Sequence, residues 1–212
     1  MLVVNEIFFS IQGESTHSGK PCVFIRLTNC NLRCAYCDTA YAYTEGKEMS
    51  ISEIMNEAGK YDCKLVEITG GEPLLQQEVH PLMTRLCDEK YEVLLETSGS
   101  IDIGSVDQRV KRIVDFKSPS SGMENRNLME NIFCLKPVDE VKFIIGNQDD
   151  YLWAKSIVLK YDLPARCSVL MSVVFGKLEA NRLVGWILQD KLTVRFQLQM
   201  QKYIWNPEAR GV

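Results

Sequence analysis

The 212-residue sequence has little histidine, no long apolar run and no basic run. Without a long apolar run it offers no membrane span, and its start, MLVVNEIFFSIQGES, lacks the basic segment and cleavage site of a signal peptide. The formal net charge of -4 and a pI near 5.4 disfavour a surface that follows a phosphate backbone. We therefore expect a cytoplasmic protein that binds small ligands, and neither nucleic acid nor a membrane.

Eight short β-rich runs follow one another along the chain. A length of 212 residues suits one domain with its own core, which we expect to span residues 1–212. Most of the runs are separated by segments long enough for helical crossovers, which favours a parallel sheet. The runs cover residues 3–9, 22–28, 65–69, 92–97, 112–116, 140–146, 168–174 and 194–200.

Two helix starts can be read from capping residues. Ser50 with Glu53 forms a capping-box pattern, which predicts a helix from Ile51 to about Gly59. We expect Asp149 or Asp150 to cap a second helix that ends near Tyr161. Because the chain is shorter than a full eight-unit barrel, the predicted fold is α/β, a partial TIM-like parallel β/α barrel.

Four polar or glycine-rich loops follow predicted strands. They are NCNLRCAYCDT after residues 22–28, GGEP after 65–69, SGS after 92–97 and KSPSSG after 112–116. Ligands of parallel α/β folds bind where the strands end, so these loops should share one rim. The segment 118–127 within this set is expected to be an active-site lid or a surface loop.

The first of these loops holds Cys30, Cys34 and Cys37 in CxxxCxxC spacing. Structural zinc needs four protein ligands, usually in two pairs, and the sequence has no second CxxC and only two histidines. Zinc with a distant fourth cysteine remains an alternative, whereas a 4Fe-4S cluster uses three cysteines and leaves one iron open. The remaining cysteines are read as small buried hydrophobes without a function: Cys22, Cys63, Cys87, Cys134 and Cys167.

The cysteine loop resembles that of the radical S-adenosylmethionine (SAM) enzymes. Tyr36 before the last cysteine and the GGEP loop, Gly70 to Pro73, strengthen the resemblance. It implies a 4Fe-4S cluster held by Cys30, Cys34 and Cys37, with SAM bound at the open iron. The two glycines would allow close approach of the backbone to SAM, and Glu72 is expected to brace the loop rather than act as a base.

A narrower resemblance covers nearly the whole chain. EIFFSIQGES, Arg26 within FIRLTNC, ITGGEP, LLETSGS, DFKSPSSG, DEVKFII and LQMQKYIWNPEARGV are similar, in order, to segments of the 7-carboxy-7-deazaguanine synthase family. The family implies a carbon-nitrogen lyase of queuosine and 7-deazapurine biosynthesis. It implies conversion of 6-carboxy-5,6,7,8-tetrahydropterin to 7-carboxy-7-deazaguanine with loss of ammonia, using SAM and Mg²⁺.

The resemblance also implies roles for individual residues. Arg26 would bind the substrate carboxylate in bidentate fashion, and Thr39 would contact Mg²⁺. The other implied substrate contacts are Ile11, Gln12, Gly13, Glu14 and Thr69. The implied SAM contacts are Tyr36, Cys37, Asp38, Gly71, Glu72, Asp115, Phe116, Lys117, Ser172, Val173 and Val174. The sequence departs from the family pattern at Asp115 and Phe116, where several relatives have Ser-Pro, and at Gln201, where many have His.

Two other functions stay open at this point. A glycyl-radical-enzyme activase shares the cysteine and GGEP-like motifs but acts on a protein. A zinc-binding protein without catalysis needs only the thiols. The family resemblance adds three partners: a pterin substrate, an electron donor such as flavodoxin or ferredoxin, and a second copy of the chain in a homodimer.

Overall fold

The computed structural model describes residues 1–212 and contains a single nine-stranded sheet. The sheet order is β3-β1-β2-β4-β5-β6-β7-β8-β9, and β3 does not pair with β9, so the barrel is incomplete. The strands are β1 (Leu2–Ile11), β2 (Pro21–Leu27), β3 (Lys47–Met49), β4 (Leu65–Gly70), β5 (Glu92–Thr97), β6 (Lys111–Phe116), β7 (Glu140–Ile145), β8 (Ser168–Val173) and β9 (Arg195–Phe196).

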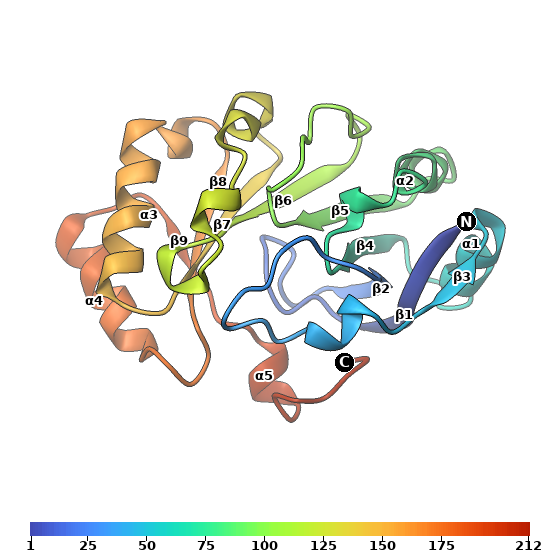
Figure 1. The fold of residues 1–212 in the computed structure, drawn as a ribbon, viewed down its shortest axis with the longest axis horizontal. Helices are drawn as coiled ribbons and strands as arrows, with labels where there is room; N and C mark the ends of the chain where they lie inside the picture. The colour runs from blue at the N-terminus through green and yellow to red at the C-terminus, as the bar shows by residue number, and fades with distance from the viewer.

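Helices surround the strands on the outside (Figure 1), with α3 and α4 on one side and α1 and α2 on the other. The α-helices are α1 (Ile51–Gly59), α2 (Val79–Asp88), α3 (Gln148–Lys160), α4 (Ala180–Asp190) and α5 (Gln201–Ile204). Short 3₁₀ helices are η1 (Ala40–Tyr43), η2 (Pro73–Leu75), η3 (Pro119–Ser121), η4 (Glu124–Arg126), η5 (Met129–Cys134) and η6 (Leu163–Ala165). No helix is long and apolar enough to cross a membrane.

The partial parallel barrel is confirmed, although the sheet is not parallel throughout. All pairs from β2 to β9 are parallel, but β1 pairs antiparallel with both β2 and β3. The connection from β5 to β6 contains no helix, and that from β6 to β7 contains only 3₁₀ helices. The expected strand at 194–200 shrinks to Arg195–Phe196, because the following residues turn toward the cavity described below.

The two helix predictions had different outcomes. Ser50 and Glu53 form the capping box of α1, as expected. The second helix, α3, ends at Lys160 with Tyr161 as its C-cap, as expected, but the expected cap residue was wrong: Asn147 is the N-cap, and its side chain accepts from the backbone N of Asp150. The Asp150 carboxylate instead accepts from the backbone N of Ser120 and of Gly146, at 2.8 Å each.

The alternation of side chains along the parallel strands explains the layout of the interior. Outward residues such as Val66, Ile68 and Val141 pack beneath the helices in the main apolar core, where each buried aliphatic side chain contributes about 1.5–3 kcal/mol. Successive residues of a strand face opposite sides, so alternate positions face the barrel interior. These inward positions hold charged residues toward the strand ends: Glu67, Glu96, Asp115 and Lys142.

Candidate active site

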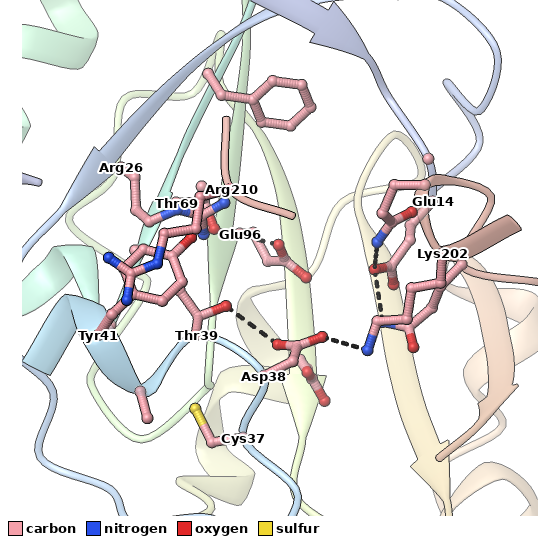
Figure 2. A pocket seen from close by; sticks show the side chains of 18 of the residues that line it. Glu14, Arg26, Cys37, Asp38, Thr39, Tyr41, Thr69, Glu96, Lys202 and Arg210 are labelled. Carbon is pink, nitrogen blue, oxygen red and sulfur yellow. Dashed lines mark hydrogen bonds and ion pairs between the residues drawn. The ribbon is translucent and has the colours of Figure 1, made fainter. Parts of the chain in front are cut away.

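A cavity of about 750 Å³ opens at the carboxyl ends of the strands, and its walls are mostly polar. The β1–β2 loop, the three-cysteine loop, the GGEP loop and the C-terminal segment 206–212 all reach it. Figure 2 shows Arg26, Thr69, Tyr41 and Arg210 gathered on one side, and Glu14 and Lys202 on the other, with Glu96 between them. The rim predicted from the loops is therefore the site of this cavity.

The cysteine loop begins where β2 ends at Leu27. Thr28 donates its hydroxyl to the carbonyl of Glu45, and Asn29 takes a positive φ of 82° that turns the chain. The regular alternation of β2 therefore does not continue to Cys30, although Arg26 and Cys30 both line the cavity. Downstream, the backbone N of Ala35 donates to the carbonyl of Ser121 at 2.9 Å, so the segment 118–127 supports this loop.

The GGEP loop packs directly beneath the cysteine loop. A side chain at Gly71 would collide with the carbonyl of Asn29 and with Cys30, so this contact requires glycine. Glu72 is fully buried and its carboxylate accepts from Thr97, Ser98 and the backbone N of Leu74. Glu72 thus braces the loop, as expected.

The residues present fit a 4Fe-4S cluster with SAM. Three thiols on one loop are only partly buried and face the cavity, and soft thiolates are the ligands of such clusters. Beside them, Tyr36 Oη and Asp115 Oδ1 are buried polar atoms with no hydrogen-bond partner in the chain. Both residues line the cavity. Buried polar atoms normally have partners, so this wall is complete only with a polar ligand.

Single-metal binding does not fit the same residues. No group of three His, Cys, Asp or Glu side chains converges in a way that could hold one ion. Zinc requires such convergence of four ligands at about 2.0–2.3 Å. The distant cysteines lie elsewhere, with Cys22, Cys87 and Cys167 buried in the body of the protein. The zinc alternative is therefore not supported by the geometry.

Arg26 lies in a cluster at one wall of the cavity. Its Nε donates to Glu6 Oε1 at 2.7 Å, and Tyr41 donates to the same oxygen at 2.9 Å. Glu6 faces Arg26 across the antiparallel pair of β1 and β2. The guanidinium also lies over the rings of Phe8 and Tyr41. It keeps N–H donors for a second acceptor, since only Nε is bound to Glu6.

The IQGE segment, residues 11–14, packs against the C-terminal part of the chain. The backbone N of Met200 donates to the carbonyl of Gly13 at 3.0 Å, and a side chain at Gly13 would collide with Gln201. The carboxylate of Glu14 accepts from Gln199 and Gln201 at 3.0 Å each and from Lys142 at 3.1 Å. Gln201 stands where the family usually has His, and it still donates to Glu14.

Three charged residues of the interior were missed by the sequence reasoning: Glu67, Glu96 and Lys142. Glu67 is buried and accepts from Gln12, and its pKa is raised well above 4.5 by burial and by the nearby Glu96. Burial alone would lower the pKa of Lys142, but Glu14, Glu96 and Asp115 raise it well above 10.5. The sequence did contain a signal for these three residues, because each is a charged residue within an otherwise apolar strand, as in LVEIT, LLET and EVKFII.

Thr39 and Asp38 lie at the mouth of the cavity. Thr39 donates to Asp38 at 3.1 Å, and Asp38 pairs with Lys202 of α5 at 2.7 Å (Figure 2). Burial would raise the pKa of Asp38, but Lys202 lowers it. The side chains of Asp38 and Thr39 therefore place oxygen atoms close to the cysteine loop. Oxygen atoms are the ligands that Mg²⁺ prefers.

Most of the expected contact residues line the cavity, and four do not. Glu72 braces its loop, while Phe116 packs its ring against Phe143 in the core. Ser172 and Val173 are buried at the end of β8 beside the cavity wall formed by Val174. The expected residues that line it are Ile11, Gln12, Gly13, Glu14, Arg26, Cys30, Cys34, Tyr36, Cys37, Asp38, Thr39, Thr69, Gly71, Asp115, Lys117 and Val174.

Comparisons with known proteins agree with this geometry. The family described as the Radical SAM superfamily matches residues 24–120. The 7-carboxy-7-deazaguanine synthase of Chlorobaculum tepidum is 47% identical over all of this chain and 97% of its own length. That of Koribacter versatilis is 44% identical over 99% of both chains. The crystal structure of QueE from Escherichia coli has the same fold, with a TM-score of 0.74, 21% identity and coverage of 92% of this chain and 93% of that one.

The open barrel with three cysteines at its rim defines a radical SAM enzyme. Sequence identity of 44–47% over nearly the whole chain narrows the assignment from this superfamily to one family. The chain belongs to the 7-carboxy-7-deazaguanine synthase family. Membership in the superfamily implies a 4Fe-4S cluster and SAM.

Proposed function

We propose that the chain converts 6-carboxy-5,6,7,8-tetrahydropterin to 7-carboxy-7-deazaguanine with loss of ammonia, as a lyase in queuosine and 7-deazapurine biosynthesis. The observation that carries the proposal is that one cavity brings the IQGE segment, Arg26 and Thr69 together with the three-cysteine loop. Sequence similarity along nearly the full length to relatives named for this activity supports the proposal. It also favours this reaction over activation of a glycyl-radical enzyme.

The cluster and SAM would occupy the side of the cavity formed by Cys30, Cys34 and Cys37. When bound, they supply one-electron chemistry that generates a hydrogen-abstracting organic radical. Gly71 lets the backbone approach SAM, and Tyr36 and Asp115 offer their free polar atoms to it. The remaining proposed SAM contacts are Cys37, Asp38, Lys117 and Val174, which line this side of the cavity. Glu72, Phe116, Ser172 and Val173 support this wall from behind and are not proposed as contacts.

The substrate would occupy the other side. Arg26 is oriented by Glu6 and presents its remaining N–H donors to the substrate carboxylate. Ile11, Gln12, Gly13, Glu14 and Thr69 form the rest of the proposed pterin site. Thr39 is the proposed Mg²⁺ contact, with substrate oxygens and water completing the six ligands that Mg²⁺ prefers.

The proposal also covers the domain organisation, the compartment and the partners of the protein. Residues 1–212 act as one domain, which the single sheet and its main core support. The protein acts in the cytoplasm as a homodimer and receives electrons from a flavodoxin or ferredoxin. A reducing compartment suits its eight free cysteines.

Anaerobic turnover tests the function directly. The reconstituted protein, given SAM, Mg²⁺, a reductant and the tetrahydropterin, should release ammonia and a product with deazaguanine ultraviolet absorbance. Metal analysis of the same sample should find iron and sulfide in about fourfold excess over protein. Stoichiometric zinc in anaerobically prepared protein, or absence of the deazaguanine product, would contradict the proposal.

A further inference from the structure

Lys142 lies on β7 inside the barrel, and only 5% of its side chain is exposed. Its ammonium contacts Glu14 at 3.1 Å, Asp115 at 3.7 Å and Glu96 at a shorter distance. These three acidic residues come from the β1–β2 loop, β6 and β5, respectively. One buried cation therefore joins three separate elements of the cavity wall.

The charge balance of the interior makes this cation necessary. Four acidic side chains face the same space, and the only other lysine beside them, Lys117, pairs with Asp115 at 2.8 Å. A buried carboxylate without a counter-charge is costly, because desolvation disfavours its ionised form. Lys142 compensates these groups from the centre of the cluster; the charged groups that face it are Glu14, Glu67, Glu96, Asp115 and the more distant Asp38.

Glu96 is the member of the cluster that is open to a ligand. Its carboxylate is 27% exposed, with Oε1 bound by Lys142 and Oε2 accepting from Thr69 at 3.3 Å, a long bond. Glu14, in contrast, already accepts from three donors of the chain. A ligand with N–H donors would thus find acceptor capacity at Glu96 rather than at Glu14.

We propose that Lys142 is a positioning residue whose ion pair with Glu96 orients that carboxylate to accept N–H groups of the pterin. It also links this part of the cavity, through Asp115, to the side assigned to SAM. The inference rests on the proposed function and adds two residues, Glu96 and Lys142, to its site.

The main test compares Lys142→Met, Lys142→Arg and the control Lys155→Met. Lys155 forms an ion pair with Asp190 on the outer helices, away from the cavity. Anaerobic binding of the tetrahydropterin is measured at pH 7, with SAM binding and iron content measured on the same samples. Lys142→Met should weaken pterin binding by about 10- to 100-fold at pH 7, the scale of a lost buried charge contact.

SAM binding and rescue by arginine separate positioning from a general structural effect. Lys142→Met should keep SAM binding and iron content near those of the wild type while pterin binding falls. Lys142→Arg should recover most of the pterin binding, and Lys155→Met should bind normally. A Lys142→Met protein that binds the pterin normally, or that loses SAM binding and iron together with pterin binding, would overturn the proposal.

Glu96→Gln keeps the test decisive if Lys142→Met does not fold. Alone, it should weaken pterin binding by at least about tenfold. In the Glu96→Gln background, Lys142→Met should add little, because its effect passes through Glu96. Normal binding by Glu96→Gln, or fully additive losses, would reject the inference. Product formation by the wild type is scored separately, so failure of the proposed function remains distinguishable.

Discussion

At the scale of single residues, the cavity is a set of charges arranged by neighbours that sequence proximity does not reveal. Glu6 orients Arg26 from an adjacent strand, and Lys142 contacts acidic residues far from it in sequence. Each such pair is partly or wholly buried, so removing one partner leaves the other uncompensated. A single substitution at one of these residues should therefore change ligand binding more than a substitution in an exposed surface ion pair would.

Arg26→Ala should weaken tetrahydropterin binding by about one to three orders of magnitude, because a charge-assisted contact to the carboxylate is lost. Arg26→Lys should recover only part, since an ammonium cannot reproduce the bidentate geometry. Anaerobic titration with the pterin and with SAM measures both effects. Normal pterin binding with loss of SAM binding would reassign Arg26 to the cofactor.

Thr39→Ala should lower activity and reduce its dependence on Mg²⁺ without loss of the cluster. The hydroxyl is an oxygen ligand at the mouth of the cavity, and its bond to Asp38 is the only side-chain contact it makes. Turnover is measured across a Mg²⁺ series, with the cluster absorbance as the control. An unchanged Mg²⁺ dependence would reject the assignment.

Glu67→Gln should stabilise the protein at neutral and alkaline pH. Burial raises the pKa of Glu67 well above 4.5, so the folded state binds a proton that the unfolded state releases. Stability therefore falls as pH rises from the unfolded pKa toward the folded one. Gln is neutral and can still accept from Gln12. Denaturant unfolding should show the gain at pH 8 and little difference at pH 4; an equal effect at both would contradict this.

At the scale of elements, the sequence predicted the strands that are buried on both faces and the capping box of α1. Continuous apolar runs bounded by turn residues are typical of such strands. The antiparallel pairing of β1 could not be read from its pattern, because one strand alone does not indicate its partner. The packing of Gly13 on Gln201 was likewise invisible, since it joins opposite ends of the chain.

Alanine at any of Cys30, Cys34 or Cys37 should abolish turnover and cluster absorbance while the barrel still folds. The loop lies at the rim and contributes no strand to the sheet, and two remaining ligands do not retain the cluster. Circular dichroism checks folding and iron analysis checks the cluster. Cys87→Ala, on α2 in the outer core, is the control that should keep its iron. A loop variant with full iron and activity would contradict the assignment.

At the scale of the whole molecule, the C-terminal segment 206–212 closes one side of the cavity. Arg210 pairs with Glu45 at 2.9 Å and lies 3.9 Å from the centre of the Tyr41 ring, on the same side as Arg26 (Figure 2). The cysteine loop and the barrel were foreseeable from local motifs. The closure of the cavity by the C-terminal segment could not be predicted, because the last residues carry no strand or helix pattern.

Removal of residues 207–212 should leave the fold and the cluster intact and weaken pterin binding by about tenfold. The segment lines the cavity but belongs to no strand or helix, and loss of a few partly exposed contacts costs about 1–2 kcal/mol. Arg210→Gln is the matched point variant. Thermal unfolding and pterin titration test this, and a truncated protein that loses its iron would show that the segment also supports the cluster.

The ion pair between Lys202 and Asp38, which directly follows the last cysteine of the loop, has a consequence for the order in which parts of the protein are made. The three-cysteine loop leaves the ribosome early, whereas the segment that covers its side of the cavity is among the last to emerge. At about 5–20 residues per second, the interval between the two is on the order of ten to thirty seconds. During that time we expect the three thiols to be accessible for cluster assembly, because the C-terminal segment does not yet cover them.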